Sequence, residues 1–484
     1  MKHFVGILLI FCCFFGTTYS QKLVSVTYKG ARTKQQITTM FSLPFVKYGA
    51  KYYAVNYISP DAKGNQDTLS GLMVVPDDLS FEFPRLVYQH GTSDCKTCVP
   101  SRYGSSGGEE GQLGLLFAGL GFVTILPDYV GMGDGRGFQT YVHGATTVSA
   151  SVDMLTACAE WSATNSVFTN DQLFVTGYSQ GGYASMALHK YLEETQGPIS
   201  ITAAAHLSGP YSLSGVMRDL ILGDVPYFYP AYVPNTVLGF NEVNGNLFSD
   251  LNEFFKAEYV ADIKRYYDGV ISLTSLNIKL IQLLQSNTGA SVGGRMIRDD
   301  VKEEIKNNPL HPANLILKEN DVFDWAPQVP TRIFYCKADD QVPYLNSIVA
   351  KDTMSANGAP NLMVTDVSPS SNHGQCVTPA ITNTVLFFLS LQKITSSVKE
   401  TNDVTAVNIY PNPVSDLLMI DGLNGKETII ITNNQGQVIT QRQVLGSEIA
   451  NFDFSNIPTG LYLISVHSES GKTIKTQKVI KSHD

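Results

Sequence analysis

A serine flanked by glycines is the most chemically distinctive feature of the sequence. Ser179 lies in the run GYSQGG at residues 177–182, which follows an apolar, β-rich stretch and precedes small residues that favour a helix. A serine on a sharp strand-to-helix turn needs small residues two positions before and after it, because larger side chains would collide with the neighbouring backbone. The pattern predicts a nucleophile elbow, with Ser179 attacking an acyl carbonyl. The alternative is a serine in an ordinary glycine-rich turn.

A serine nucleophile needs a histidine as general base and an acid that orients the imidazole. On the fold that carries such elbows, the chain order is serine, acid, histidine. Four histidines lie beyond residue 300: His311, His373, His467 and His483. His311 is flanked by prolines in a helical region and the last two belong to a separate C-terminal segment, so His373 is the candidate base. Asp339 and Asp340, at the end of the preceding predicted strand, are the candidate acids.

Two other histidines are interpreted as structural. His206 lies within a predicted strand and precedes both candidate acids, so we expect a buried histidine with satisfied hydrogen bonds. His90 follows another predicted strand, and we expect it to orient the turn there rather than to transfer protons.

The pattern of the chain predicts an α/β sheet that would hold these residues. Apolar and polar residues alternate in opening strands at residues 22–28, 51–58, 68–75 and 85–89. Later strands at 122–126, 199–208, 331–337 and 361–367 alternate with helices at 113–120, 146–162 and 378–391. This repeated order of strand, loop and helix is that of a mostly parallel sheet, with His373 in a loop after the last strand.

The alternation stops between about residues 211 and 325. This stretch contains an aromatic run, YFYPAY at 227–232, which is interpreted as a loop. Helical segments follow at 251–267, 270–286 and 295–307. We expect a helical cap that covers the active site, excludes water and shapes specificity.

Length and composition limit the class of protein. A chain of 484 residues is too long for one simple core, so two or more domains are expected. A net charge of -9 gives no basic surface for nucleic acid, and no nucleic-acid partner is expected. The glycine series at 131–135 matches no dinucleotide-binding register, and neither a cofactor nor a metal is expected.

The N-terminus predicts export. Lys2 precedes an apolar run at residues 4–15, and Thr18 and Ser20 occupy the small-residue positions of a cleavage site. This is the pattern of a signal peptide over residues 1–20. An apolar run of this length is too short to span a membrane, and no transmembrane segment is expected in the mature protein.

Five cysteines remain after the expected signal peptide: Cys95, Cys98, Cys158, Cys336 and Cys376. Cys95 and Cys98 form a lone C-x-x-C pair in an exported chain, which favours a small disulfide loop over a zinc or redox site. Cys336 and Cys376 lie beside the two proposed catalytic loops, and we expect them to pair. Cys158, in a helical stretch, is then a buried free thiol.

With these residues in place, the chain resembles the α/β-hydrolase superfamily and, within it, the secretory lipases. The resemblance spans residues 40 to 395 approximately and rests on YQHGT at 88–92, LPDYVGMG at 126–133, GYSQGG at 177–182, ADDQVP at 338–343 and NHG at 372–374. It implies a helical cap inserted between nucleophile and acid, and esters of fatty or other hydrophobic acids as substrates. Prolyl-peptidase-like members share the elbow, but the repeats of a propeller domain are not visible in this sequence.

The resemblance also assigns roles. The family's aspartate stands three residues before a Val-Pro pair, which fits Asp339 with residues 342–343, and Asp340 is the second choice. The first oxyanion-hole loop of the family follows the strand that ends at residue 89. Backbone N–H groups of Gln180, with Gly91 or Thr92, would then stabilise the tetrahedral oxyanion.

The C-terminal segment carries a second resemblance. After a polar linker at 396–406, residues 407–484 alternate strand patterns with Gly and Asn turns and predict a small antiparallel β-sandwich. YPNP at 410–413, GQ at 436–437 and PTGLY at 458–462 resemble the C-terminal sorting domain of bacterial type IX secretion. This implies passage through the periplasm and across the outer membrane, with the tail removed or replaced at the surface. The alternative is a carbohydrate-binding or adhesive module.

These observations predict an α/β-hydrolase domain over residues 21–395 and a secretion domain over 407–484. The predicted function is a secreted serine hydrolase that cleaves small-molecule or lipid esters of carboxylic acids, with the secretion machinery as partner of its tail. Two alternatives remain: a peptidase, amidase or polysaccharide esterase with the same site, and an inactive surface-binding protein. The complete set of Ser179, Asp339 and His373 argues against the inactive protein.

Overall fold

The computed structural model describes residues 21–105, 108–195, 197, 199–396, 407–423, 425–445, 449–469, 471 and 473–482. The expected signal peptide at 1–20 and the expected linker beyond residue 396 lie outside the described residues. The chain divides into two compact units, residues 1–397 and 398–484.

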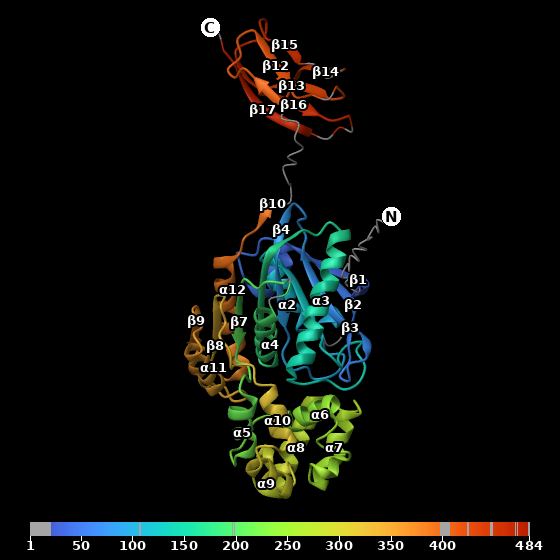
Figure 1. The fold of residues 1–484 in the computed structure, drawn as a ribbon, viewed down its shortest axis with the longest axis vertical. Coiled ribbons are helices and arrows are strands. Elements are labelled where there is room, and N and C mark those ends of the chain that lie inside the picture. The colour runs from blue at the N-terminus through green and yellow to red at the C-terminus, as the bar shows by residue number, and fades with distance from the viewer. Residues whose placement is uncertain are drawn as a thin grey trace, which may run out of the picture. The chain divides into compact units, whose positions relative to one another are not determined.

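A ten-stranded sheet forms the centre of the first unit in the described part of the chain (Figure 1). Its main order is β1-β2-β3-β5-β4-β6-β7-β8-β9, and β10 pairs with β4. The strands are β1 Leu23–Arg32, β2 Ala50–Pro60, β3 Gln66–Pro76, β4 Phe81–Gln89, β5 Val123–Pro127, β6 Thr169–Tyr178, β7 Ala203–Leu207, β8 Thr331–Tyr335, β9 Leu362–Asp366 and β10 Thr395–Ser396. All neighbours from β5 to β9 pair in parallel, and the first three strands are antiparallel. The expected mostly parallel sheet is confirmed.

Helices cover both faces of this sheet because its central strands are apolar on both sides. Phe174 of β6 packs against Phe388 of α12, with ring centroids 4.9 Å apart. The next residue, Val175, points to the other face and shares a core cluster with Met154 of α3 and Leu188 of α4. The first face carries α1 Lys34–Phe41, α2 Gly111–Gly119 and α12 His373–Leu391, and the second carries α3 Gly144–Thr164, α4 Gln180–Thr195 and α11 Leu345–Ala356.

The closing helix α12 begins earlier than expected. The sequence placed its start at residue 378, beside Pro379, with His373 in a loop. In the structure His373 is the first residue of α12, and Pro379 lies inside the helix. Asn372 and Gln375 form a capping box that fixes this earlier start, because each side chain accepts a backbone N–H of the other residue.

Among the residues that the structure describes, α12 is also the single helix whose length and apolar composition would suit a membrane crossing. Its residues Val385 and Phe388 are buried in the core cluster on the sheet. This is the ordinary position of a core helix.

The chain leaves the sheet between β7 and β8 and forms a helical insertion, as the resemblance implied. The insertion contains η2 Leu213–Met217, a π-helical turn, followed by α5 Arg218–Leu222, α6 Tyr232–Asn244, α7 Ala257–Tyr267, α8 Leu273–Thr288, α9 Asp299–Asn307 and α10 Pro312–Glu319. These helices gather beyond one end of the sheet, in green and yellow (Figure 1). They pack around a core of their own that includes Ile263, Leu276 and Leu280. Helix α6 starts at the end of the aromatic run that the sequence placed in a loop.

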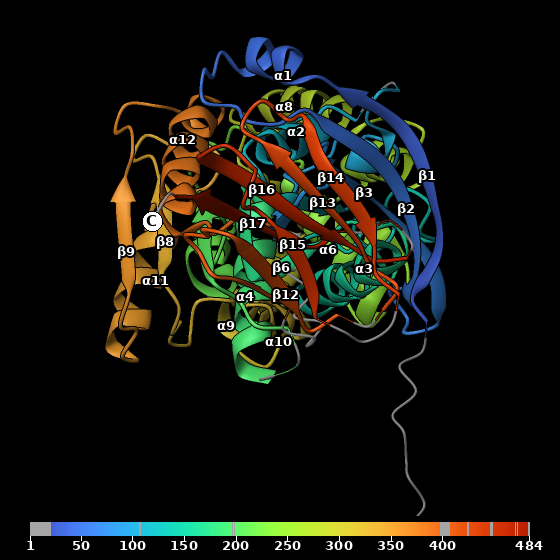
Figure 2. The same cartoon turned by 90° about the horizontal axis from the view of Figure 1, so that it is seen from above.

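The second unit contains two antiparallel sheets around one core, which confirms the expected β-sandwich. In the described residues one sheet has the order β11-β12-β15 and the other β14-β13-β16-β17, whose strands lie side by side in Figure 2. The strands are β11 Asn408–Tyr410, β12 Leu417–Asp421, β13 Thr428–Asn433, β14 Val438–Gln443, β15 Ala450–Asp453, β16 Gly460–His467 and β17 Thr473–Lys481. Leu418 and Ile464, one from each sheet, are fully buried in the shared core.

Candidate active site

Ser179 lies on the turn between β6 and α4 and has a left-handed backbone, with φ of 61°. Residues other than glycine pay a steric cost there, so the surrounding structure must hold the turn. The Ser179 N–H donates to the carbonyl of Leu207 at 2.9 Å, and its carbonyl accepts from the N–H of Tyr183 at 3.1 Å. These two bonds join the turn to β7 and α4.

The glycines beside Ser179 are required by close backbone approach. A Cβ atom on Gly177 would lie 2.4 Å from the carbonyl oxygen of Gly181. A Cβ atom on Gly181 would lie 2.0 Å from the carbonyl oxygen of Gln89 at the end of β4. The spacing that defines the motif therefore reflects the packing of β4 against the start of α4.

The structure brings Ser179, His373 and Asp339 together in one line of hydrogen bonds. The Nε2 atom of His373 lies 2.9 Å from the Oγ atom of Ser179. Its Nδ1 atom lies 2.7 Å from Oδ2 of Asp339, whose side chain is fully buried. The other carboxylate oxygen of Asp339 accepts the backbone N–H groups of Gln341 and Val342 at 3.0 and 2.8 Å. These contacts fix the carboxylate and, through it, the imidazole.

Asp340 contacts the backbone of His373 instead of its ring. Its Oδ1 atom accepts the His373 backbone N–H at 3.1 Å. A carboxylate in this position complements the positive end of α12 and fixes the residue that begins the helix. The two neighbouring acids therefore contact different parts of the same histidine.

A disulfide and a tyrosine also anchor the loops beside His373. The expected pair Cys336–Cys376 is confirmed, and it joins the residue after β8 to the first turn of α12. The Tyr178 hydroxyl donates to the His373 carbonyl at 2.6 Å. The second expected disulfide, Cys95–Cys98, is also present, and Cys158 is free and buried.

The three residues expected at the oxyanion hole come from neighbouring segments. Gly91 and Thr92 follow β4, and Gln180 is the first residue of α4. The contact between Gly181 and the end of β4 brings these segments together. The N–H of Gln180 is in the first turn of α4, where backbone donors have no partner within the helix.

His90 is a buried part of the same loop. It stacks on Tyr129 with ring centroids 4.1 Å apart, and its Nδ1 and Nε2 atoms lie 2.7 and 3.2 Å from the carbonyl oxygens of Gly91 and Asp128. Burial lowers the pKa of the His90 ring, which favours the neutral form.

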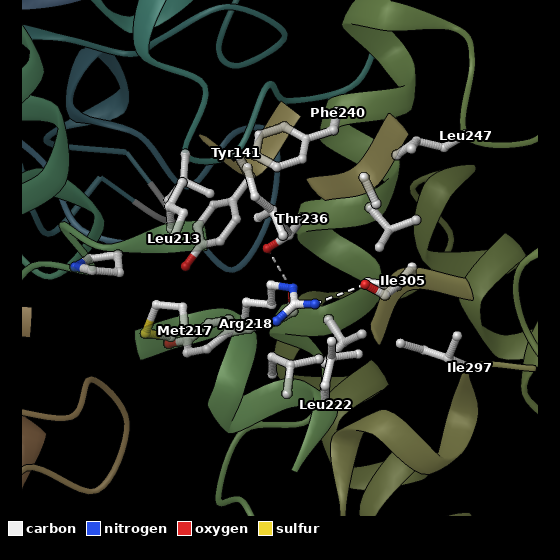
Figure 3. A pocket seen from close by; sticks show the side chains of 18 of the residues that line it. Tyr141, Leu213, Met217, Arg218, Leu222, Thr236, Phe240, Leu247, Ile297 and Ile305 are labelled. Atoms are coloured by element: carbon white, nitrogen blue, oxygen red, sulfur yellow. Dashed lines mark hydrogen bonds between the residues drawn. The ribbon is translucent and has the colours of Figure 1, made fainter. Parts of the chain in front are cut away.

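A mostly apolar cavity of about 110 Å³ extends from Ser179 into the cap. Figure 3 shows side chains from the cap and from the loop before α3 around it. Lining residues include Tyr141, Leu213, Met217, Ile221, Thr236, Phe240, Leu247, Ile297 and Ile305. None of these residues was predicted from the sequence to line a site, because they are mostly apolar and become neighbours only through the fold.

His206 of β7 is part of a buried chain of hydrogen-bonded side chains between β7 and α4. Its Nδ1 atom lies 2.8 Å from Ser185 Oγ, and its Nε2 atom lies 3.2 Å from His189 Nδ1. His189 Nε2 lies 3.0 Å from Glu193 Oε1. Burial lowers the pKa of both rings.

The described residues contain no cluster of three or more His, Cys, Asp or Glu side chains that could hold a metal ion.

Buried histidines give the stability of the first unit a defined pH dependence. His143 is the N-cap of α3 and accepts the Thr146 N–H at 3.3 Å, and burial lowers its pKa to about 4. The unfolded chain gains this proton near pH 6.5 and the folded chain only near pH 4. The free energy of unfolding must therefore fall as the pH drops through this window.

We predict that His143→Asn reduces this fall, because asparagine keeps the N-cap acceptor but does not titrate. Between pH 7 and 5 the wild type should lose about 2 kcal/mol more than the variant. Urea unfolding followed by tryptophan fluorescence measures this, since both tryptophans, Trp161 and Trp325, lie in the first unit. Equal losses in the two proteins would contradict the assignment.

Each of the two units contains a segment that matches a known protein family. Residues 408–482 match the family model of the secretion system C-terminal sorting domain, and residues 114–194 match that of the prolyl oligopeptidase family. Each match covers less than half of the chain. No curated protein matches the sequence.

Solved structures share the fold of the first unit. A candidate hydrolase from Legionella pneumophila is 23% identical with a TM-score of 0.67, over 77% of this chain and 98% of that one. The rice cell wall degrading esterase LipA from Xanthomonas oryzae is 20% identical with a TM-score of 0.65, over 76% and 97%. Lipase A from Candida antarctica is 15% identical with a TM-score of 0.54, over 74% and 78%.

The first unit therefore has the α/β-hydrolase fold. The chain combines it with a secretion system C-terminal sorting domain, which indicates secretion or a place at the cell surface through the type IX system.

Proposed function

We propose that this protein is a secreted serine hydrolase that cleaves carboxylic esters through an acyl-enzyme intermediate. One observation carries the proposal: Ser179, His373 and Asp339 form a continuous line of hydrogen bonds, and Ser179 lines an apolar cavity under the cap. The line supports nucleophilic attack by a serine, and the cavity supports binding of a hydrophobic acyl group.

In the proposed mechanism, Ser179 Oγ attacks the ester carbonyl while His373 Nε2 takes its proton. His373 returns that proton to the leaving alcohol as the ester C–O bond breaks, which leaves the acyl group on Ser179. Water then attacks the acyl-enzyme with His373 again as base, and the acid is released as Ser179 regains its proton. Asp339 stabilises the positive imidazolium in both steps.

The tetrahedral intermediates carry negative charge on the former carbonyl oxygen. We propose that the N–H groups of Gln180 and of Gly91 or Thr92 stabilise this charge. Their position at the start of α4 and after β4 supports this role, because fixed backbone donors need no reorganisation during the reaction. The positive end of the α4 dipole adds to the effect.

The cavity favours an ester over a peptide as substrate. A peptide substrate extends on both sides of the scissile bond and needs polar partners for its backbone, whereas this cavity is lined mainly by apolar side chains. The match to the prolyl oligopeptidase model favours the peptidase alternative, but it is confined to residues 114–194, from α2 to α4. These elements hold the nucleophile and not the cap.

We further propose the domain layout that the sequence predicts. Residues 1–20 would be removed as a signal peptide on entry into the periplasm, and the hydrolase domain would extend over 21–395. A linker at 396–406 would join it to the sorting domain at 407–484. The type IX machinery would recognise that domain during passage across the outer membrane.

Hydrolysis of p-nitrophenyl esters tests the function. The full chain should hydrolyse esters of medium-chain acids faster than the acetyl ester, because a longer chain fills the cavity. Ser179→Ala should lower kcat at least about 10⁴-fold. Peptide hydrolysis that depends on Ser179, without ester hydrolysis, would support the peptidase. Failure on both substrate classes would support the inactive binding protein.

Substitution of the two neighbouring acids, Asp339 and Asp340, should lower kcat to different extents. Asp339→Asn should lower kcat about 10³- to 10⁴-fold, because the amide no longer stabilises the imidazolium or fixes its tautomer. Asp340→Asn should lower kcat less than about tenfold, because its amide oxygen can still accept the His373 backbone N–H. Steady-state kinetics on one ester measure kcat for both variants. Equal losses of kcat would exclude Asp339 as the acid that orients His373.

A further inference from the structure

Arg218 is the single charged side chain among the described residues that line the cavity. It is the first residue of α5, and only 21% of its side chain is exposed. Figure 3 shows the side chain between Thr236 and Leu222, with its guanidinium directed toward Ile305. A cation in an otherwise apolar acyl pocket needs a physical explanation, because burial of a charge without a charged partner is costly.

The contacts of Arg218 within the cap leave its charge largely uncompensated. Its Nε donates to Oδ1 of Asn314 at 2.7 Å, and its Nη2 donates to the carbonyl of Ile305 at 2.8 Å, and both acceptors are neutral. The carboxylate of Asp219 lies 3.5 Å from Nη1, but that side chain is 76% exposed. Water screens such a pair strongly. Of the five guanidinium N–H donors, these two hydrogen bonds use two.

The packing of the cap does not require a cation at this place. The Ile305 carbonyl also accepts the side-chain amide of Asn314 at 2.7 Å, so it keeps a partner without Arg218. That amide also donates to the carbonyl of Asn308 at 2.9 Å, which joins α10 to the end of α9 independently. A neutral side chain with an N–H donor could keep the hydrogen bond to Asn314 Oδ1 without the cost of burying a charge.

We infer that Arg218 selects acyl groups that carry a carboxylate at their far end, so that monoesters of aliphatic dicarboxylic acids are the preferred substrates. The inference rests on the proposed ester hydrolysis at Ser179. The chain of methylene groups would lie along the apolar lining, and the distal carboxylate would accept the spare guanidinium donors. A guanidinium binds a carboxylate with two parallel hydrogen bonds, and mostly apolar surroundings strengthen them.

The test compares each mono-p-nitrophenyl ester of a linear dicarboxylic acid with the neutral p-nitrophenyl alkanoate of the same chain length. Acids of six or more carbons are used, so that the free carboxylate cannot attack the ester through a small ring. For at least one chain length, the wild type should show a kcat/KM at least about tenfold higher for the carboxylate ester. Preference for the neutral ester at every length would overturn the inference.

Variants then assign the preference to Arg218. Arg218→Gln keeps a donor for the Ile305 carbonyl but loses the charge, and should reverse the preference by raising KM for the carboxylate esters alone. Arg218→Lys should retain part of it, because the charge remains but the two-pronged geometry is lost. Arg295→Gln is the matched control: Arg295 bonds Asp224 and the Thr288 carbonyl within the cap but does not line the cavity, and its loss should leave the preference unchanged.

A structural role for Arg218 gives a different result. Arg218→Gln would then lower kcat/KM for both ester classes by the same factor, and this outcome overturns the inference. The neutral esters distinguish failure of the Arg218 inference from failure of the proposed function. If the wild type does not hydrolyse the neutral esters in a Ser179-dependent manner, the proposal of ester hydrolysis is contradicted. If they are hydrolysed without any carboxylate preference, only the role of Arg218 fails.

Discussion

The site depends on how closely three backbone segments approach one another around Ser179. The end of β4, the end of β6 and the start of α4 pack so tightly that Gly177 and Gly181 have no room for a Cβ atom. This contact imposes the left-handed backbone of Ser179 and presents its hydroxyl beyond the end of the sheet. It also sets the N–H of Gln180 beside the loop that follows β4. One steric constraint therefore positions both the proposed nucleophile and the proposed oxyanion donors.

The opposite half of the site is held by polar contacts and a covalent bond. His373 comes from α12, and the start of that helix is fixed by the capping box of Asn372 and by the carboxylate of Asp340. The disulfide from Cys336 to α12 joins the same helix to the end of β8, from which Asp339 follows. The imidazole is consequently oriented by the backbone around it as well as by Asp339. Preorganisation of this kind lowers the reorganisation needed during proton transfer.

Much of this site could be predicted from the sequence because its constraints are local. The glycines around Ser179, the acids after one strand and the disulfide partners beside the two loops each leave a pattern within a few residues. The predicted start of α12 was wrong because Pro379 suggests the first turn of a helix, whereas the capping box at Asn372 starts the helix at His373, five residues before Thr378. The start of α6 at Tyr232 was also missed, because tertiary packing in the cap overrides the loop-like run of aromatics before it.

The cavity could not be predicted, since its lining comes from side chains far apart in the chain. Arg218 illustrates the difficulty: beside Asp219 in the sequence it resembles an ordinary surface ion pair, and only the fold places it in an apolar pocket. Recognition of such a residue needs the position of the cap helices relative to Ser179. Local sequence patterns predict the arrangement of Ser179, His373 and Asp339, whereas the lining of the cavity depends on tertiary packing.

Covalent labelling with an alkyl fluorophosphonate tests the central claim most directly, because this reagent reacts preferentially with a serine whose hydroxyl is activated. Intact-mass analysis of the folded full chain should show one adduct, and peptide mapping should place it on Ser179. His373→Ala should abolish the labelling while the protein remains folded. Absence of any adduct on the folded wild type, or an adduct on another serine, would contradict the account.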